Sequence, residues 1–345
     1  MGDGDNLRVA IDAMGGDYAP REIVAGALDA IREIEDLEII LVGREDDIRR
    51  CIDQEDGQGV DLKRVTIMHT DEVIDNNEDP GLAIRRKKES SMVMALELAR
   101  SGEADAVISA GNTGALMAGG LLMLGRLSGM KRPALLAELP ISEDECVVLM
   151  DVGANMDAKP EQLYQYAQIG KIYTQEVLGK PNPRIALLNV GTEENKGNAQ
   201  VKRAYELIKE NKELNFVGNL EAKDLYVDKT DILICDGFVG NVFLKTYEGM
   251  ARNIFTYFYK GAQRSMGDSP ELASAIVDLY ANLDESEHGG AVLVGLDGVC
   301  IKCHGYSKRR AVTQTLLKRA YPFVNKNTNA KIEEELKQTL KEEQE

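Results

Sequence analysis

Short apolar runs rich in β-branched residues recur along the chain, each followed by a polar, glycine-containing loop and then by a longer amphipathic segment. Six runs show the whole pattern, at residues 7–12, 106–110, 146–151, 185–189, 232–235 and 299–303. Four more apolar runs predict strands at 38–42, 65–69, 135–139 and 215–217. Strands that alternate with helices form βαβ units. The pattern therefore predicts a three-layer α/β/α fold, with a large, mostly parallel sheet covered by helices on both faces.

The loops after these strands combine glycine with asparagine or threonine, as in Gly-Asn-Thr-Gly at 111–114. In a parallel sheet such loops converge at the carboxyl ends of the strands, where ligands bind. Glycine lets the backbone approach a ligand, and amide side chains and the N–H groups of a helix start are donors for an anion. We therefore predict an anion site formed by Gly111, Asn112, Thr113, Gly114, Asn155, Gly191, Thr192 and Gly240. Any one such loop is as often a plain turn, and only their number favours a site.

Three other kinds of site fit the motifs poorly. The glycine spacing matches neither G-x-G-x-x-G nor G-x-x-x-x-G-K-[ST], which argues against a Rossmann dinucleotide site and a P-loop. Residues 300–304 read C-x-x-C-H, the form of a haem attachment site, but we interpret both cysteines as small apolar residues of a buried strand end. Cys235 is either an acyl-enzyme nucleophile or, as we expect, a core residue. We predict no metal and no cofactor.

Composition and charge narrow the class of protein. The 345 residues are 43% hydrophobic and 29% charged, as in an ordinary globular protein. The polar N-terminus does not resemble a signal peptide and no apolar stretch reaches the ~20 residues of a bilayer span, so we expect a cytoplasmic protein. Five cysteines, an odd number, favour reduced thiols. The net charge of -17 argues against nucleic acid as a partner, and any acidic partner needs a local basic patch.

Seven motifs occur in one order along these loops. They are DAMGGD (12–17), AIRRKKESSM (83–92), SAGNTGALMA (109–118), DVGAN (151–155), LLNVGTEENKGN (187–198), DGFVGNVFLK (236–245) and His304-Gly305. In these motifs the chain, from about residue 7 to 321, resembles the PlsX family, the acyl-acyl-carrier-protein:phosphate acyltransferases of bacterial phospholipid synthesis. Val292, Tyr306 and the segment 265–288 depart from the family pattern.

The resemblance implies a fold like that of isocitrate and isopropylmalate dehydrogenases. Residues 1–330 would form a single catalytic domain of two intertwined halves around one mixed sheet, and residues 331–345 a charged C-terminal tail. The resemblance also implies a homodimer and a reaction in which inorganic phosphate takes a long-chain acyl group from acyl carrier protein. The products would be acyl phosphate and the free carrier. Some members of the family associate peripherally with membranes, so the resemblance also allows contact with a membrane surface.

The implied reaction needs cationic and amide donors more than it needs a protein nucleophile. Phosphate is already an anion and a thiol with a pKa of about 8.5 leaves readily, so the site must mainly position phosphate and stabilise an oxyanion. We predict that Lys196, Asn241 and Lys245 hold phosphate or the oxyanion. We predict that His304 donates to the oxyanion or protonates the thiolate. The plain alternatives are a surface ion pair for Lys245 and a hydrogen-bonded loop position for His304.

Two basic runs stand out from the acidic chain, at residues 85–88 and 308–310. Because acyl carrier protein is acidic, we predict that it docks on Arg85, Arg86, Lys87, Lys88 and Arg309. Four consecutive helical residues point in different directions, so at most two of residues 85–88 can face one partner.

An aromatic-rich helix is predicted at residues 250–262, with basic residues close by. Aromatic rings beside cations suit a membrane interface, and a dimer contact is the plain alternative. The residues predicted to make this contact are Phe255, Phe258 and Tyr259.

Two other functions stay open on the sequence alone. An NAD(P)-dependent β-decarboxylating dehydrogenase shares the implied fold, but it would need clustered metal-binding aspartates and an adenosine site, for which the chain has no clear signature. A non-catalytic regulator would bind acyl carrier protein or phosphate without releasing a free thiol.

Overall fold

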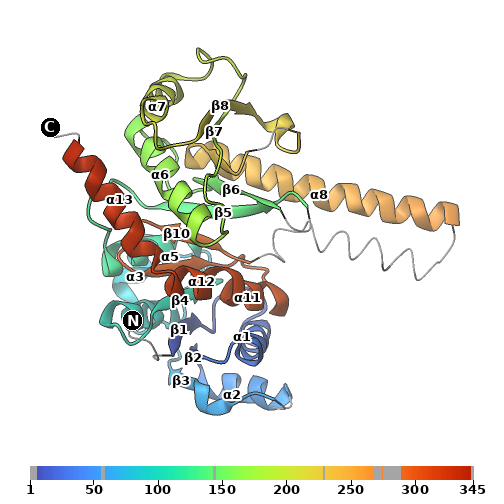
Figure 1. Cartoon of the computed structure of the whole chain (residues 1–345). Coiled ribbons are helices and arrows are strands. Elements are labelled where there is room, and N and C mark those ends of the chain that lie inside the picture. Colours follow the sequence, from blue (N-terminus) through green and yellow to red (C-terminus); the bar gives the residue numbers. More distant parts are fainter. Residues whose placement is uncertain are drawn as a thin grey trace. The chain divides into compact units, whose positions relative to one another are not determined.

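The computed structural model describes residues 6–55, 59–142, 145–227, 230–266, 274 and 289–342 (Figure 1). The chain forms two compact units. The first unit contains residues 1–133, 175–179 and 289–345, and the second contains residues 134–174 and 180–288. The chain therefore passes from the first unit to the second after residue 133, returns briefly at residues 175–179, and returns again at residue 289. That these units act as one domain of two intertwined halves stays a prediction.

The sheet of the first unit runs in the order β3 (Val65–His69), β2 (Leu37–Gly43), β1 (Leu7–Asp12), β4 (Ala106–Ser109), β11 (Val299–Lys302) and β10 (Ala291–Val294). Neighbouring strands are parallel, except that β10 and β11 form an antiparallel pair. The register places Asp12 beside Ser109, and Ser109 beside Lys302. The loops that follow β1, β4 and β11 therefore start side by side.

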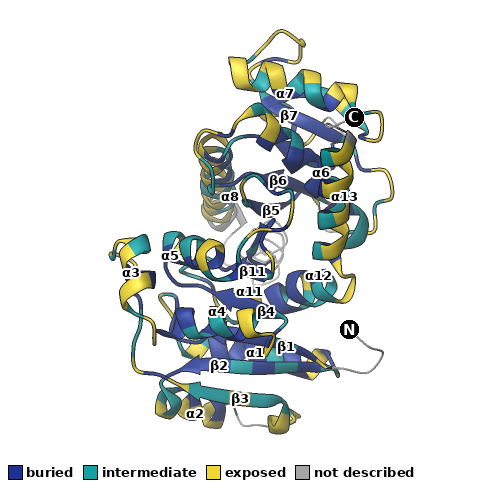
Figure 2. Ribbon diagram, turned by 90° about the vertical axis from the view of Figure 1, so that its left-hand side faces the viewer, coloured by how far each residue is buried: buried dark blue, intermediate teal, exposed yellow. Residues whose placement is uncertain are grey.

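Helices cover both faces of this sheet. Nearly every residue of β1 and β4 is buried, which requires cover on both sides of the strands (Figure 2). α4 (Ser91–Ser101) packs on β1, β2 and β4, while α1 (Arg21–Glu33) packs on β2 and on α11 (Arg309–Thr315). The remaining helical segments of this unit are α2 (Glu45–Gln54), η1 (Leu62–Arg64), α3 (Pro80–Arg86), α5 (Thr113–Gly119), the π-helical turn η2 (Gly120–Leu124), η4 (Leu316–Ala320), α12 (Tyr321–Asn325) and α13 (Thr328–Glu342).

The start of α3 and the end of α4 show how the sequence sets these elements. The Asp79 carboxylate accepts a hydrogen bond of 2.9 Å from the backbone N–H of Leu82, and Pro80 occupies the first helical position, where its missing N–H costs nothing. α4 ends at Gly102, which adopts a φ of 77° and so takes the left-handed conformation that closes many helices.

The sheet of the second unit runs in the order β5 (Ala134–Pro140), β6 (Cys146–Met150), β9 (Ile232–Ile234), β7 (Ile185–Asn189) and β8 (Phe216–Glu221). β5 and β6 form an antiparallel hairpin, and the other neighbours are parallel. Among its described residues, the helical segments of this part of the chain are α6 (Pro160–Glu176), α7 (Ala199–Glu210), η3 (Ala222–Asp224) and the 30-residue α8 (Gly237–Met266). Figure 1 shows the second half of α8 running out beyond β5 and β6.

The α/β fold with a large, mixed and mostly parallel sheet is confirmed. All ten predicted strands form, most with ends shifted by one or two residues, whereas the sequence analysis missed β10. α8 is much longer than the predicted aromatic helix at 250–262, and most of the divergent segment 265–288 lies outside the described residues. The predicted tail at 331–345 begins inside α13, where Ile332 and Leu336 are buried; its last three residues lie outside the described part. No helix among the described residues has the length and apolarity needed for a membrane span.

An ion-pair cluster ties together the starts of β7 and β9. The Asp231 carboxylate accepts hydrogen bonds of 2.9 Å from Lys180 Nζ, 3.0 Å from Arg184 Nε and 2.9 Å from the backbone N–H of Arg184. Burial alone would raise the pKa of this carboxyl, but the Arg184 and Lys180 hydrogen bonds outweigh burial and lower the pKa to about 2. The ionised form is therefore favoured by folding.

The Asp231 cluster predicts a pH-dependent loss of stability. Because the folded pKa is below the ordinary value of 3.8, the stabilisation is complete above about pH 4 and is lost as the pH falls toward about 2. Asp231→Asn should lower the free energy of unfolding at pH 7 by about 1–2 kcal/mol, with a difference from wild type that shrinks below pH 4. Urea unfolding followed by circular dichroism at pH 7, 5 and 3 measures both. An equal difference at all three pH values would contradict this role of the charge.

Candidate active site

Polar loops gather at the carboxyl ends of the parallel strands in each unit, as the sequence predicted. We call the loops after β1, β4 and β11 the first-unit cluster, at residues 13–20, 110–112 and 303–308. We call the loops after β6, β7 and β9 the second-unit cluster, at residues 151–159, 190–198 and 235–236, together with the first turn of α8.

Asp12 organises the first-unit cluster. Its carboxylate is 2% exposed and accepts hydrogen bonds of 2.6 Å from both Ser91 Oγ and Ser109 Oγ, and one of 3.3 Å from the backbone N–H of Met14. Burial raises the pKa of Asp12, and the two serine hydroxyls oppose that rise. A Cβ on Gly15 would lie 2.6 Å from the same carboxylate, so only glycine fits there. Asp12 therefore shapes these loops from inside and is not exposed to a ligand.

Asn112 also has partners within the protein. Its side-chain oxygen caps α5 by accepting a 3.0 Å hydrogen bond from the backbone N–H of Ala115. Its amide group lies 3.2–3.3 Å from the backbone carbonyl oxygens of Asp75, Asn76 and Glu78. Gly111 is buried, Gly114 is half-buried and Thr113 is exposed at the start of α5. Asn112 therefore fastens the loop before α5, and its predicted contact with substrate stays a prediction.

His304 lies in the third loop of the first-unit cluster. It is half-buried, and its ring stacks on Tyr306 with centroids 5.1 Å apart. The next residue, Gly305, accepts a 2.7 Å hydrogen bond from the backbone N–H of Asp17, which joins the loops after β11 and β1. The predicted role of His304 as a proton donor stays a prediction.

Asp151 organises the second-unit cluster. One carboxylate oxygen accepts hydrogen bonds of 3.1, 3.0 and 2.8 Å from the backbone N–H groups of Leu135, Gly153 and Ala154. The other accepts hydrogen bonds of 2.7 and 3.0 Å from the backbone and side chain of Asn155. Burial raises the pKa of Asp151, and these hydrogen bonds oppose the rise. The motif DVGAN thus folds around its own aspartate.

The first turn of α8 is pressed against that loop. The backbone N–H of Gly237 donates a 2.8 Å hydrogen bond to the carbonyl of Asn155. A Cβ on Gly240 would lie only 1.9 Å from the Asp151 carbonyl oxygen, so no side chain fits at 240. Asn241 is exposed. It lies beside the DVGAN loop, because a Cβ on Gly153 would be 3.9 Å from the Cβ and Cγ of Asn241. The structure therefore brings Asn155, Gly240 and Asn241 together, and their predicted contact with substrate stays a prediction.

Lys196 lies in the loop after β7. Its stem crosses Gly191, where an added Cβ would lie 3.0 Å from Lys196 Cγ. Its Nζ is 3.9 Å from a carboxylate oxygen of Glu193, a weak contact for two side chains that are 46% and 63% exposed. The loop is held by Asn189, whose side chain donates to the Lys196 carbonyl at 3.2 Å. The Lys196 ammonium, like the exposed Thr192 in the same loop, faces solvent.

Lys245 forms an ion pair within the protein, which was the alternative to its predicted role in holding phosphate. Its Nζ lies 2.8 Å from both carboxylate oxygens of Glu248, one turn further along α8. Half of its side chain is exposed, and a catalytic role for Lys245 stays a prediction.

The basic residues predicted to dock a carrier protein differ in their surroundings. Lys87 pairs with Glu78 at 2.6 Å, and the Arg309 guanidinium bonds Asp29 and lies 2.7 Å from Glu55. Arg85, Arg86 and Lys88 are exposed, and no carboxylate of the described residues forms an ion pair with them. Only these three keep their charge available to a partner.

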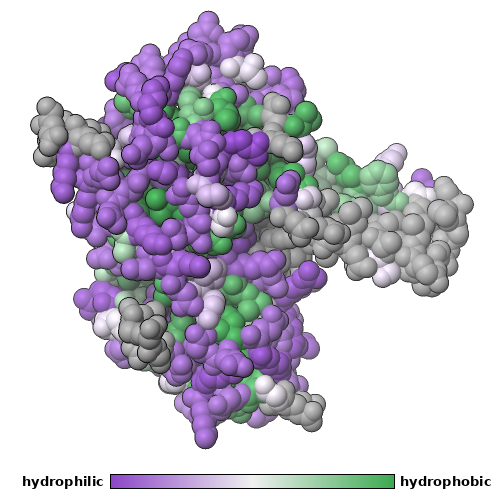
Figure 3. Space-filling view, in the orientation of Figure 1, coloured by the Kyte–Doolittle hydropathy of each residue, from purple (hydrophilic) through white to green (hydrophobic). Residues whose placement is uncertain are grey.

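The aromatic residues predicted to contact a membrane, at 255–259, lie on the outer half of α8. Tyr257 is 85% exposed and Phe258 is 65% exposed, and Tyr259 is also exposed, whereas Phe255 is half-buried. Figure 3 shows hydrophobic side chains gathered along this part of α8.

Four of the five cysteines are buried, and Cys146 is half-buried. Burial raises the pKa of the Cys235 thiol well above its ordinary value, and the nearby Asp151 adds to the rise, so this thiol is a poor nucleophile at neutral pH. Burial likewise raises the pKa of Cys300 to about 12. Among the described residues, no group of three or more histidine, cysteine, aspartate or glutamate side chains is placed to hold a metal.

The sequence analysis did not identify the two aspartates that organise the loops, Asp12 and Asp151, or the serines that bond Asp12, Ser91 and Ser109. All four lie in the motifs quoted above, and each aspartate directly ends or follows an apolar strand. A carboxylate at the end of a buried strand, followed by a glycine-rich loop of unpaired N–H groups, is the signal that would have found the two aspartates.

The chain matches known proteins over most of its length. The family described as "Fatty acid synthesis protein" matches residues 7–331. A protein from Bacillus cereus named "Phosphate acyltransferase" is 47% identical over 311 residues, which cover 89% of this chain and 91% of the relative. A protein of the same name from Bacillus thuringiensis is 46% identical with the same coverage.

Solved structures with the same fold include two phosphotransacetylases. One, from Streptococcus pyogenes, is 18% identical with a TM-score of 0.58, and covers 93% of this chain and 95% of its own. The EutD phosphotransacetylase from Staphylococcus aureus is 15% identical with a TM-score of 0.57, and covers 92% of this chain and 94% of its own. At these identities the likeness concerns the fold.

The contact between α8 and the DVGAN loop predicts opposite effects for two glycines of α8. Gly240→Ala should lower the free energy of unfolding by about 1–3 kcal/mol or more and reduce activity, because the new methyl group must displace the Asp151 backbone. Gly249→Ala is the matched control, since a Cβ there meets nothing within 4 Å. It should stabilise α8 by up to about 1 kcal/mol. Thermal unfolding of both variants measures the effects, and equal stability of the two would contradict the close contact.

Proposed function

We propose that this chain, which belongs to the fatty acid synthesis protein family and is an acyltransferase, moves a long-chain acyl group from acyl carrier protein to inorganic phosphate. The acyl phosphate would then serve phospholipid synthesis. The proposal draws support from the motifs along the chain, from the family and from relatives named for phosphate acyl transfer. Neither the dehydrogenase nor the non-catalytic regulator considered above gains support from these relatives.

The observation that favours phosphate as a ligand is the pair of available donors in the second-unit cluster. Lys196 presents an ammonium group with only a long contact to Glu193, and Asn241 presents an exposed amide beside the start of α8. The start of a 30-residue helix adds the positive end of the helix dipole, while the N–H groups of Gly237 and Val239 already bond Asn155 and Asp236. A dianion at this place would gain one full positive charge and the neutral amide of Asn241.

The same donors suit the reaction itself. Attack of a phosphate oxygen on the thioester carbonyl forms a C–O bond and places negative charge on the carbonyl oxygen. Collapse of that intermediate breaks the C–S bond and releases the carrier thiolate, which takes a proton from solvent or from a donor such as His304. Lys196 and Asn241 would hold phosphate in line and stabilise the oxyanion, each through a direct hydrogen bond.

The proposal predicts equal formation of two products. Incubation with long-chain acyl carrier protein and phosphate should release free carrier thiol and acyl phosphate in equal amounts, and only when phosphate is present. Thiol release without phosphate would indicate a thioesterase, and no release would contradict the proposal.

In the same assay, Lys196→Ala and Asn241→Ala should each lower kcat by about 10²–10³, the usual cost of losing an oxyanion donor. Lys202→Ala is the matched control, because it removes an exposed lysine from α7, just beyond the loop that holds Lys196. If both site variants turn over within a few-fold of wild type, the assignment of these two residues is wrong.

Carrier docking is proposed for at most two of Arg85, Arg86 and Lys88, whose charges have no partner among the described residues. Salt screens exposed charges, with a Debye length of about 10 Å at 0.1 M. Raising the salt concentration in the assay should therefore raise KM for the carrier substrate with little change in kcat. A salt-insensitive KM would count against docking on these residues.

A membrane surface is proposed as the partner of the outer half of α8, where the exposed rings lie close to Arg252, Lys260 and Arg264. Wild type should float with vesicles that contain anionic lipid, and Phe258→Glu should float at least several-fold less. Asn253→Glu is the matched control, because it adds the same charge at an exposed polar position of the same helix. If wild type does not bind vesicles and is a dimer in solution, whereas Phe258→Glu has the mass of a monomer, this face belongs to a homodimer contact instead.

A further inference from the structure

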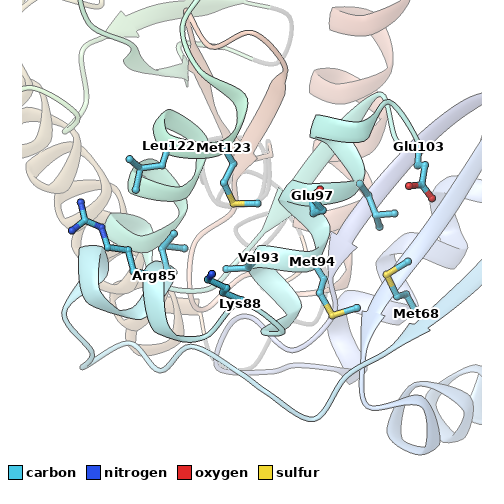
Figure 4. Close-up of a pocket in the computed structure, with 11 residues that line it drawn as sticks. Met68, Arg85, Lys88, Val93, Met94, Glu97, Glu103, Leu122 and Met123 are labelled. Atoms are coloured by element: carbon cyan, nitrogen blue, oxygen red, sulfur yellow. The ribbon is translucent and has the colours of Figure 1, made fainter.

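A pocket of about 560 Å³ opens on the first unit (Figure 4). Figure 4 shows its walls coming from β3, α3, α4 and η2. The residues that line it are Met68, Ile84, Arg85, Lys88, Val93, Met94, Glu97, Leu98, Glu103, Leu122 and Met123. Pockets of about 300–1,000 Å³ commonly hold small organic ligands, so this one is large enough for a ligand.

The wall of the pocket is apolar and adaptable. Seven of its eleven lining residues are aliphatic or methionine, and the three methionines come from β3, α4 and η2. Methionine is unbranched and flexible, so its side chain adjusts to ligands of variable shape. Leu122 is 56% exposed at the opening, although it is a large apolar residue. Such a wall suits a flexible hydrocarbon chain better than a rigid polar ligand.

The charged residues of the pocket fall into two groups. Glu97 is neutralised by Arg100, with Arg100 Nε at 2.7 Å, and Glu103 accepts a 2.9 Å hydrogen bond from Ser101. Arg85 and Lys88 are exposed and have no ion pair with any described carboxylate. The available charge at the pocket is therefore positive on balance, with Arg85 and Lys88 against the carboxylate of Glu103, in a protein whose net charge is -17. An anionic head group would lie next to Arg85 and Lys88, with its tail along the methionines.

We infer that this pocket binds the hydrocarbon chain of a long-chain acyl group, and that a free fatty carboxylate would in addition place its anionic end at Arg85 and Lys88. The inference rests on the proposed function, because it assigns the chain to the acyl group that the enzyme transfers. It also gives the segment 83–92, which lies outside both loop clusters, a role in selecting substrates by chain length.

Binding of simple fatty carboxylates tests the pocket without carrier protein or phosphate. Each methylene that leaves water strengthens binding by up to about fourfold. Tetradecanoate should therefore bind full-length protein at least about tenfold more tightly than decanoate in calorimetric titration. Leu122→Glu should weaken tetradecanoate binding at least about tenfold, because it places a like charge at the opening. Leu121→Glu, the same change at the neighbouring exposed leucine that does not line the pocket, should stay within about twofold of wild type.

The head-group contact has its own test. Wild type should bind tetradecanoate more tightly than tetradecanol, and the double variant Arg85→Ala/Lys88→Ala should lose most of that preference. Equal loss of tetradecanoate binding in Leu121→Glu and Leu122→Glu, or no loss in either, would overturn the assignment. Circular dichroism melts confirm that the exposed substitutions leave the fold intact.

Turnover then separates the acyl group of the substrate from a lipid unrelated to catalysis. If the inference holds, Leu122→Glu raises KM for a 14-carbon acyl carrier substrate but not for a 4-carbon one, and tetradecanoate competes with the longer substrate. Binding of tetradecanoate without competition would overturn it. If wild type binds tetradecanoate but transfers no acyl group to phosphate, the proposed function fails while the pocket stands as a fatty-chain site.

Discussion

A buried aspartate at the end of a central strand holds together the polar loops of each unit. Moving a carboxylate out of water is costly unless hydrogen bonds replace its hydration. Asp12 meets this need with two serine hydroxyls and a backbone N–H, and Asp151 with five N–H bonds from residues 135 and 153–155. The pKa of each carboxyl is still raised, because burial outweighs the hydrogen bonds. Each loop is thus held in one conformation around its aspartate, because the buried carboxylate would destabilise the fold without these hydrogen bonds.

The glycines of the motifs follow from this constraint. A loop that wraps closely around a carboxylate leaves no space for side chains, as the 1.9 Å distance between a Cβ on Gly240 and the Asp151 carbonyl oxygen shows. Gly15 is limited in the same way by Asp12. Close packing inside the loops leaves the exposed positions, such as Asn241 and Lys196, to meet a ligand. The structural and chemical roles in these motifs therefore fall on different residues, even where those residues are neighbours.

This division explains what the sequence could and could not predict. Periodicity and β-branched runs located ten strands, because buried parallel strands must be apolar along their whole length. The sequence analysis missed β10 because Ala291–Val294 is only four residues long, pairs antiparallel with β11, and is followed by β11 with no helix between them. Residue type alone placed Asn112, Lys245 and Arg309 among the functional candidates, and the structure gives each one a partner in the protein. Partners of this kind depend on tertiary packing, so loop composition cannot reveal them.

The buried aspartates also limit how an anion can bind. The Asp151 carboxylate already uses the N–H groups of residues 153–155, so these donors are not available to phosphate, and its negative charge repels phosphate nearby. The net charge of -17 adds to that repulsion. Neutral amides such as Asn241 offer hydrogen bonds but no positive charge to offset it. A cation must therefore complete the second-unit cluster, and Lys196 is suited to that part because its own pairing with Glu193, at 3.9 Å between exposed side chains, is weak enough to be exchanged for a ligand.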